Sequence, residues 1–139
     1  MSRKYVPFII ILVLCLIICN SFQLIYASGP SMEPTCVAGD VLIVTRWYGT
    51  PKVGDIVLIQ TDQKLVIKRI AAIEGQIAQD TQSITYSYWS QQEDAAVPSN
   101  YVFVLGDNPD HSRDSRDENF GLVHVDQVIG KVIFIWKGA

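Results

Sequence analysis

The chain has 139 residues, of which 49% are hydrophobic and 18% are charged, and this length predicts a single domain. Its formal net charge is −3, and the residues after Ala27 carry nine basic and fourteen acidic side chains, a net charge of −5. Because nucleic-acid binding depends on dense Lys and Arg surfaces, this balance excludes nucleic acid as a partner.

The first predicted element is an apolar segment from Tyr5 to Ala27, which contains no charged side chain. A helix of this length would cross the hydrocarbon layer of a bilayer, which is roughly 30 Å thick. A cleaved secretory signal is the alternative, because the strongest apolar run extends only from Val6 to Cys19. We favour a retained transmembrane anchor formed by residues 1–27.

The charges around this segment predict its orientation. Arg3 and Lys4 precede it and no basic residue follows it directly, so we expect a single-pass protein of the cell membrane with a cytoplasmic N-terminus. Residues 28–139 then form an extracytoplasmic domain that faces membrane lipid. Only Cys36 lies in that domain, so no disulfide is expected within it.

The predicted domain contains short β-rich runs bounded by Gly, Pro, Asp and Gln, with no sustained helical periodicity. We therefore predict a mainly β fold with an antiparallel, barrel-like sheet. Residues 61–64 are expected to close a hairpin, and the polar stretch from Gln76 to Asn100 to form a peripheral ribbon and loop. Strands are expected at Val41–Tyr48, Asp55–Gln60, Leu65–Ile73, Ile84–Trp89, Tyr101–Leu105 and Val128–Trp136.

The loop between the anchor and the first of these strands has the sequence SGPSMEPT, from Ser28 to Thr35. Its glycine and two prolines restrict the backbone, which could hold the hydroxyl of Ser31 exposed near the membrane surface as a nucleophile. A turn that only joins the anchor to the domain is the alternative interpretation.

A lysine lies inside the apolar strand from Leu65 to Ile73. Alternation of side chains along the strand places Lys68 on the same face as Val66 and Ile70. A free lysine has a pKa of about 10.4, and burial would lower it and allow the neutral amine to act as a general base. The alternative is a lysine that extends its amine to solvent.

The segment from Leu105 to Gly121, LGDNPDHSRDSRDENFG, combines a strong turn with an Asp/Arg pair. A solvated loop or a weak cation site is the alternative. Calcium-loop spacing is missing, and His111 and His124 lack a zinc-site pattern, so we expect neither metal nor cofactor. Neither histidine lies in a run typical of an oriented base, so a Ser/Lys dyad needs fewer assumptions than a Ser/His/Asp triad.

Three blocks together resemble the type I signal peptidases, peptidase family S26, over Tyr26 to about Trp136. They are SGPSMEPT, then VGDIVLIQ followed by LVIKRIAAIEG, and the late Gly-Asp-Asn block LGDNPDHSRDSRDENFG. The resemblance implies the antiparallel signal-peptidase fold behind one N-terminal transmembrane helix.

The resemblance also implies roles for individual residues. Ser31 is the expected acyl-forming nucleophile, Lys68 the general base, and Met32 part of the substrate cleft. Ser112 matches a serine whose hydroxyl orients the lysine amine. Asp114 and Arg116 match a pair that supports this serine and its loop.

The chain departs from the family pattern next to the nucleophile. Many bacterial members have a serine whose hydroxyl contributes to the oxyanion hole where this chain has Gly29, and Pro30 replaces a common glycine. Loss of one such donor costs about 3 kcal/mol in other enzymes, so the Ser31 N–H, a further amide or a water is expected to replace it. Cys36 is also an unusual choice, and the short stretch 76–100 implies a reduced second β region.

We therefore predict a membrane-bound serine endopeptidase that removes N-terminal signal peptides from secretory preproteins after small residues. Two alternatives remain open. The first is a dedicated processing peptidase with few substrates, of the organelle inner-membrane or conjugative-transfer type, which the Gly-Pro-Ser-Met block favours. The second is a non-catalytic, membrane-tethered β module that binds peptides, which the presence of both Ser31 and Lys68 disfavours.

Overall fold

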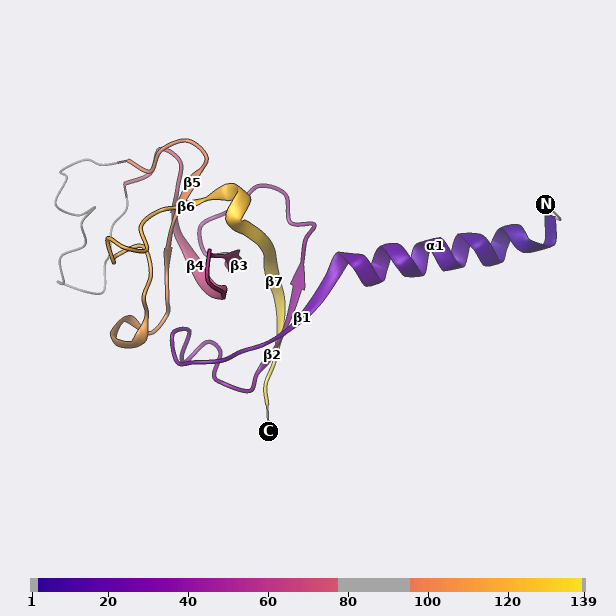
Figure 1. Ribbon diagram of the computed structural model, residues 1–139, viewed down its shortest axis with the longest axis horizontal. Helices are drawn as coiled ribbons and strands as arrows, with labels where there is room; N and C mark the ends of the chain where they lie inside the picture. The colour runs from indigo at the N-terminus through magenta and orange to yellow at the C-terminus, as the bar shows by residue number, and fades with distance from the viewer. Residues whose placement is uncertain (1–2, 78–95, 139) are drawn as a thin grey trace.

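The structure is a computed structural model that describes residues 3–77 and 96–138. It begins with a 3-10 turn, Arg3–Tyr5, and helix α1, Val6–Ser21, which projects away from the sheet (Figure 1). Every helix residue except Ser21 is exposed. Within the described part of the chain, no helix meets the length and hydropathy that a membrane span requires.

The helix is shorter than the sequence predicted. It ends at Ser21, and Phe22–Tyr26 forms strand β1 in place of the last helical turns. The reason is tertiary, because the β1 backbone pairs along its whole length with a second strand, from Phe22 opposite Thr45 to Tyr26 opposite Val41. Pairing of this kind overrides the helical tendency of a short apolar run.

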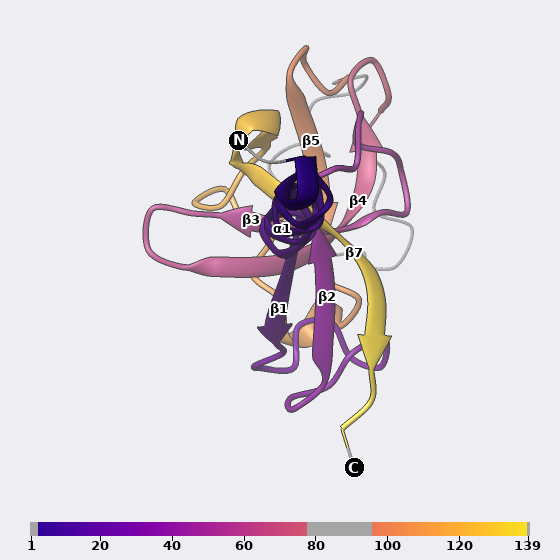
Figure 2. The same ribbon diagram turned by 90° about the vertical axis from the view of Figure 1, so that its right-hand side faces the viewer.

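A mainly antiparallel β fold is confirmed. The remaining strands are β2 (Val41–Thr45), β3 (Ile56–Gln60), β4 (Leu65–Ile73), β5 (Tyr101–Leu105), β6 (Val123–His124) and β7 (Val128–Trp136). All seven form one curled sheet in the order β1-β2-β7-β3-β4-β5-β6, with every neighbouring pair antiparallel (Figures 1 and 2). Two further 3-10 turns, Pro109–His111 and Val125–Gln127, connect strands after β5.

Most predicted strands are confirmed, and three, β4, β5 and β7, have the predicted bounds. The predicted hairpin joins β3 to β4. Strand β2 stops at Thr45 rather than at Tyr48, because the Thr45 hydroxyl accepts a hydrogen bond of 3.1 Å from the N–H of Trp47 and starts a turn. The predicted strand Ile84–Trp89 and residues 78–95 of the predicted ribbon lie outside the described residues; an isolated antiparallel bridge joins Ile77 to Ala96 at its base.

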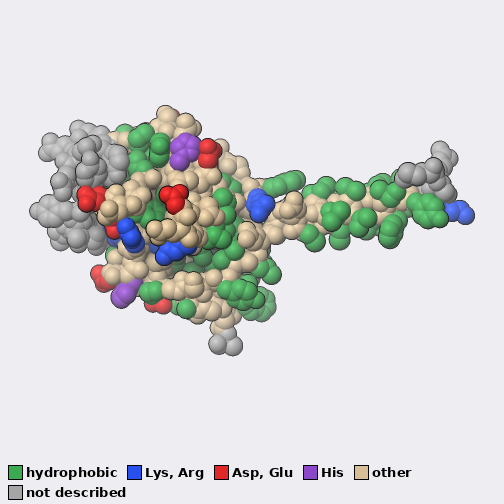
Figure 3. All heavy atoms as spheres, viewed as in Figure 1, with side chains coloured by type: hydrophobic (Ala, Val, Ile, Leu, Met, Phe, Trp, Pro, Cys, Tyr) green, Lys and Arg blue, Asp and Glu red, His purple; other side chains and the backbone are tan. Residues whose placement is uncertain are grey.

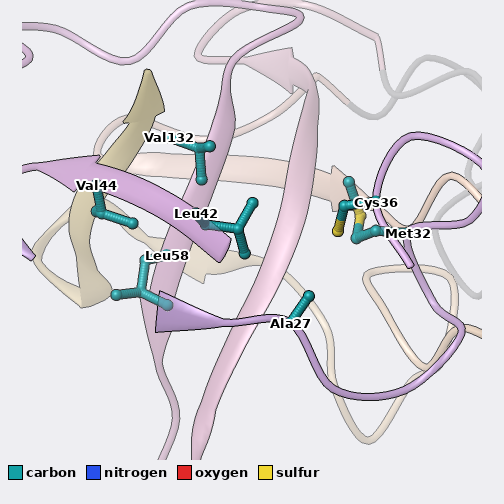
Figure 4. Packing of buried hydrophobic residues seen from close by; sticks show 7 residues of the cluster. All are labelled: Ala27, Met32, Cys36, Leu42, Val44, Leu58 and Val132. Carbon is teal, nitrogen blue, oxygen red and sulfur yellow. The ribbon is translucent and has the colours of Figure 1, made fainter. Parts of the chain in front are cut away.

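The core lies on both faces of β3, the middle strand of the sheet. Leu58 packs into one buried cluster, whereas its neighbours Val57 and Ile59 pack into another. This explains why Ile56 to Ile59 of β3 are all apolar instead of alternating with polar residues. Met32 and Cys36 lie beside one another at the end of the first cluster (Figure 4), so the core extends under the loop that carries Ser31.

Strand β4 changes its pairing partners along its length. Its first half, Leu65 to Arg69, pairs with β3, and its second half, Arg69 to Ile73, pairs with β5. On the β5 side, residues 65–68 therefore have no strand neighbour within the described residues. This open edge lies at Lys68 and forms part of the candidate site.

Candidate active site

A cleft with a volume of about 640 Å³ lies between three segments of the chain. They are the loop after β1, the β3–β4 hairpin with the start of β4, and the segment after β5. Ser31 and Lys68 both line this cleft. The structure thus places on one cleft two candidate residues that are 37 positions apart in the sequence.

Ser31 is held by the loop formed by residues 28–40, which we call the Ser31 loop. Gly29 has a φ of +85°, a conformation that favours glycine, and the N–H of Glu33 donates to the carbonyl of Pro30 at 3.1 Å. The Ser31 carbonyl accepts a hydrogen bond of 3.0 Å from the N–H of Asn108. Met32 is only 2% exposed and anchors the loop in the core, while Ser31 stays half-buried at the cleft.

Lys68 does not extend its side chain to solvent, so that alternative is wrong. The residue is 3% exposed and stands opposite Val57, which is fully buried. Burial lowers the pKa of the Lys68 amine, and the negative charge of Asp114 opposes part of this effect. The environment therefore increases the fraction of neutral amine, the form that accepts a proton.

The Lys68 amine is oriented by Ser112. Its Nζ donates to the Ser112 Oγ at 3.1 Å, and the Ser112 hydroxyl donates in turn to Asp114 Oδ2 at 2.5 Å. A hydroxyl has one proton to donate, so its bond to Asp114 leaves its lone pairs to accept from Lys68. The arrangement fixes the direction of one N–H of the amine.

Asp114 is itself held in place by further donors from Gly106 and Arg116. It is 1% exposed and accepts from the N–H of Gly106 at 2.8 Å and from Arg116 Nε and Nη2 at 2.8 and 2.7 Å. Burial alone would raise the pKa of this carboxyl, but the hydrogen bonds from Arg116, Gly106 and Ser112 outweigh it and hold the pKa below its usual value. The carboxylate therefore stays charged and fixes the Ser112 hydroxyl.

Gly106 lies between the Ser31 loop and Ser112, the residue that binds the Lys68 amine. A Cβ atom built on this residue would overlap the side chain of Ser112 and lie 2.5 Å from the carbonyl oxygen of Ser31. Only glycine therefore lets Ser112 and the carbonyl of Ser31 both lie this close to the backbone at position 106. In the sequence, Gly106 is visible only as part of a turn, because a close approach across the fold leaves no local signal.

A second ion pair at the site was also missed. Arg69 donates to both carboxylate oxygens of Asp107, at 2.8 and 2.6 Å, and to the Thr35 hydroxyl at 3.4 Å. This bidentate pair ties β4 to the Gly-Asp-Asn turn and to the Ser31 loop. The Lys-Arg pair in β4 and the acidic Asp107 were visible in the sequence, but their contact depends on the sheet.

The structure offers a backbone donor beside the candidate nucleophile. No hydrogen bond within the described residues engages the N–H of Ser31, and the preceding Pro30 has no N–H. Gly29 contributes no side chain. At the inner end of the cleft, Cys36 is 4% exposed, and burial raises the pKa of its thiol.

The histidines lie apart from the Lys68 network. His111 lines the cleft, but it is exposed and its Nδ1 lies 3.4 Å from Asn108 Oδ1. His124 caps a 3-10 turn and makes an edge-to-face contact with Tyr101. In residues 3–77 and 96–138 there is no cluster of three His, Cys, Asp or Glu residues suited to a metal.

Known proteins match this chain over most of its length. The family model described as "Signal peptidase, peptidase S26" matches residues 2–82 and 77–137. Signal peptidase I of Bacillus licheniformis is 31% identical over 163 residues, which cover 96% of this chain and 87% of the relative.

Two matches from Arabidopsis thaliana carry organelle names. The mitochondrial ATP-independent inner membrane protease subunit 1b is 38% identical over 119 residues, which cover 80% of this chain and 68% of that protein. The chloroplastic thylakoidal processing peptidase 1 is 30% identical over 133 residues, covering 75% of this chain and 38% of that protein. The resemblance predicted from the three sequence blocks is confirmed, and the chain belongs to the type I signal peptidases of peptidase family S26.

Proposed function

We propose that the protein is a membrane-bound serine endopeptidase that cleaves N-terminal signal peptides from exported preproteins with a dyad of Ser31 and Lys68. One observation carries this proposal: the Lys68 amine is buried and bonded to Ser112, in a cleft that Ser31 also lines. A peptide-binding module has no need of such a lysine. Burial of a basic group without a carboxylate in direct contact opposes folding and is found where chemistry requires it.

In the first step Ser31 Oγ attacks the scissile carbonyl carbon, and its proton moves to Lys68 Nζ. The tetrahedral intermediate then collapses as the ammonium returns the proton to the nitrogen of the leaving amine. The C–N bond breaks, the mature protein departs and the signal peptide stays bound to Ser31 as an ester. Ser112 keeps the Lys68 amine directed at this reaction through its 3.1 Å hydrogen bond.

Deacylation reverses the same proton transfers. A water gives a proton to the neutral Lys68 amine and attacks the ester carbonyl. The C–O bond of the ester breaks, the proton returns to Ser31 Oγ, and the signal peptide leaves as a carboxylic acid. We assign the Ser31 N–H to stabilisation of the oxyanion in both steps. The assignment is supported by the absence of any hydrogen bond from this N–H within the described residues.

The cleft also suits an extended substrate. Residues 65–68 present an open strand edge on one side, and Ile25 to Ala27, at the end of β1, line the other. A peptide that adds its backbone to these edges would be held across Ser31. Met32 and Gly29 line the same cleft, so we assign them to substrate binding and expect small side chains before the scissile bond.

The apolar surface next to the helix supports attachment to membrane lipid. Hydrophobic side chains cover α1 and continue onto the neighbouring part of the domain (Figure 3). On β1 and β7, Leu24, Tyr26, Phe134 and Trp136 are between 52% and 74% exposed. We propose that α1, which lies within the predicted anchor of residues 1–27, attaches the protein to the membrane with its N-terminus in the cytoplasm. The sheet from β1 onward, with residues 28–139, then forms the catalytic domain outside.

Substitution of Lys68 tests the proposed base. Lys68→Arg keeps a positive charge but replaces the amine with a guanidinium that stays protonated, so cleavage of a preprotein should be lost. Lys64→Arg is the matched control, because Lys64 lines the same cleft from the β3–β4 hairpin. Appreciable cleavage by Lys68→Arg would remove Lys68 as the base.

A dedicated processing peptidase of the same chemistry is the second candidate. The observation that favours it is the similarity to relatives named for the mitochondrial inner membrane and the thylakoid, together with Gly29 and Pro30 beside the nucleophile. A panel of unrelated preproteins distinguishes the two candidates. A general peptidase cleaves most of them, whereas a dedicated peptidase cleaves one or a few.

A further inference from the structure

The far end of the Ser31 loop is closed by a buried carboxylate that the mechanism does not use. Asp40 is 1% exposed, and its Oδ2 accepts from the N–H of Val37 at 3.0 Å. Its Oδ1 accepts from the N–H of Gly138 at 3.0 Å. The hydrogen bonds from Val37, Lys137 and Gly138 lower the pKa of Asp40 to about 2.

Lys137, which directly follows β7, connects this carboxylate to the loop. Its Nζ donates to Asp40 Oδ2 at 2.9 Å and to the backbone carbonyl of Thr35 at 2.7 Å. The chain after β7 also passes close to the loop, since a Cβ on Gly138 would lie 3.0 Å from the carbonyl oxygen of Gly39. One amine thus joins two points of the Ser31 loop.

Thr35 is therefore held from two directions. Lys137 binds its carbonyl, and Arg69, the neighbour of Lys68 on β4, donates to its hydroxyl at 3.4 Å. From Thr35 the constraint passes to the nucleophile through a tight turn, in which the N–H of Cys36 donates to the carbonyl of Met32 at 3.0 Å. A shift at Thr35 would change the position of Ser31 relative to Lys68.

We propose that Lys137 is a positioning residue for the peptidase reaction, which fixes the Ser31 loop through the Thr35 carbonyl and the Asp40 carboxylate. This inference rests on the proposed role of Ser31 as the nucleophile. Lys137 lines no part of the cleft and its side chain is 57% exposed, so its effect on the reaction passes through the loop. A misplacement of about 1 Å can cost on the order of a hundredfold in rate.

The test compares two lysines associated with β7. Lys137→Met keeps the aliphatic stem and removes the donor, and Lys131→Met removes the similar pair between Lys131 and Asp55, whose atoms lie 2.7 Å apart. We expect Lys137→Met to lower kcat for preprotein cleavage by about tenfold with KM changed less than about twofold. Lys131→Met should keep the wild-type kcat, and Lys137→Arg, which retains donors, should recover most of it.

Three results would overturn the inference: a wild-type kcat in Lys137→Met, an equal loss of kcat in Lys131→Met, or no recovery in Lys137→Arg. Melting temperatures measured on the same samples identify unfolded protein, and Lys137→Ala, which also removes the donor, replaces the methionine variant if that variant does not fold. Ser31→Ala in the same assay separates the two proposals. If Ser31→Ala is active the proposed function fails, whereas an inactive Ser31→Ala beside a fully active Lys137→Met rejects the positioning role alone.

Discussion

At the residue scale, the site consists of a proposed base, Lys68, and the groups that orient its amine. Lys68 is buried in a strand, and Ser112 and Asp114 hold its amine through a chain of two hydrogen bonds. Because burial lowers the pKa of Lys68 while the charge of Asp114 raises it, the site balances a neutral amine against a fixed carboxylate. Both properties are needed, since a neutral amine that points away from Ser31 cannot take its proton.

The pH dependence of cleavage should report the lowered pKa of Lys68. The protonated amine is inactive as a base, so kcat/KM should rise with pH through that pKa and reach its plateau below the ordinary lysine value of 10.5. Initial cleavage rates between pH 5 and 10 measure this. A rate that is flat from pH 6 to 10 would contradict the role of Lys68.

Loss of the orienting hydroxyl should impair the reaction but leave the fold intact. Ser112→Ala removes the acceptor for Lys68 and the donor to Asp114, so we expect kcat to fall by about tenfold or more with little change in melting temperature. Ser112→Thr keeps a hydroxyl and should recover part of the rate. Equal kcat values for Ser112→Ala and the wild type would show that the hydrogen bond has no part in catalysis.

At the element scale, the Ser31 loop and the segment after β5 meet at Gly106. The N–H of Gly106 binds Asp114, and its α-carbon lies against both Ser112 and the carbonyl of Ser31. The approach of two segments distant in the sequence therefore depends on one residue without a side chain. This contact sets the distance between the loop that carries Ser31 and the network that holds Lys68.

A methyl group on residue 106 should push the Ser31 loop away from Ser112. Gly106→Ala would force the side chain of Ser112 or the carbonyl of Ser31 to move, at a cost of about 1–3 kcal/mol in the free energy of unfolding. We expect a larger loss of cleavage than Ser112→Ala causes, because the Ser31 carbonyl moves as well. Urea unfolding and kcat measured on the same preparation test both expectations, and a stable, fully active Gly106→Ala would contradict the close contact.

The sequence predicted well those strands whose full length and both ends are marked by neighbouring residues. Strands β4, β5 and β7 are continuous β-rich runs bounded by turn residues, and the sequence predicted their bounds. Strand β1 was missed because it follows the apolar helix without a break in hydropathy, and β6 because it has two residues. The pairing of β1 with β2 and of β6 with β5 is visible only in the folded sheet.

In the candidate site too, residues within sequence motifs were predicted, whereas contacts between distant segments were not. The sequence identified Ser31, Lys68, Ser112, Asp114 and Arg116 through motif resemblance, and the structure places the last four in one hydrogen-bonded chain. The Arg69–Asp107 pair and the Asp40–Lys137 pair were not predicted. Each joins residues at least 38 positions apart, so no local pattern could have indicated the contact.

At the scale of the whole molecule, the β domain begins before the predicted boundary at Ala27. Strand β1 pairs with β2, and Ala27 is 6% exposed, donates to the carbonyl of Asp40 at 2.8 Å and accepts from the N–H of Gly39 at 3.0 Å. Ile25 to Ala27 also line the cleft. The segment that leads out of the helix is thus part of both the sheet and the site.

Two truncations should separate attachment from catalysis. A fragment that begins at Phe22 keeps β1, so it should fold, cleave a preprotein in detergent and no longer sediment with membranes. A fragment that begins at Ser28 loses β1 and Ala27, and its melting temperature should be lower by about 5 °C or more. Equal stability and activity of the two fragments would contradict the structural role of β1.

The burial of Lys68 should also make the stability of the whole protein depend on pH. Between the lowered folded-state pKa and the unfolded-state value near 10.5, the unfolded chain binds more protons, so the free energy of unfolding rises with pH in this window. The slope from one group is at most about 1.4 kcal/mol per pH unit. Lys68→Met should be more stable than the wild type at the low end of the window, with the difference shrinking toward pH 10.5; a difference independent of pH would contradict the lowered pKa.

The central claim, that Ser31 cleaves signal peptides from preproteins, is tested most directly by N-terminal sequencing of the products. Wild-type protein and Ser31→Ala are reconstituted in lipid vesicles and incubated with several preproteins. We predict that the wild type releases mature chains that begin after a small residue at the end of each signal peptide, and that Ser31→Ala releases none. The same new N-termini from Ser31→Ala, or no defined cleavage of any preprotein by the wild type, would contradict the account.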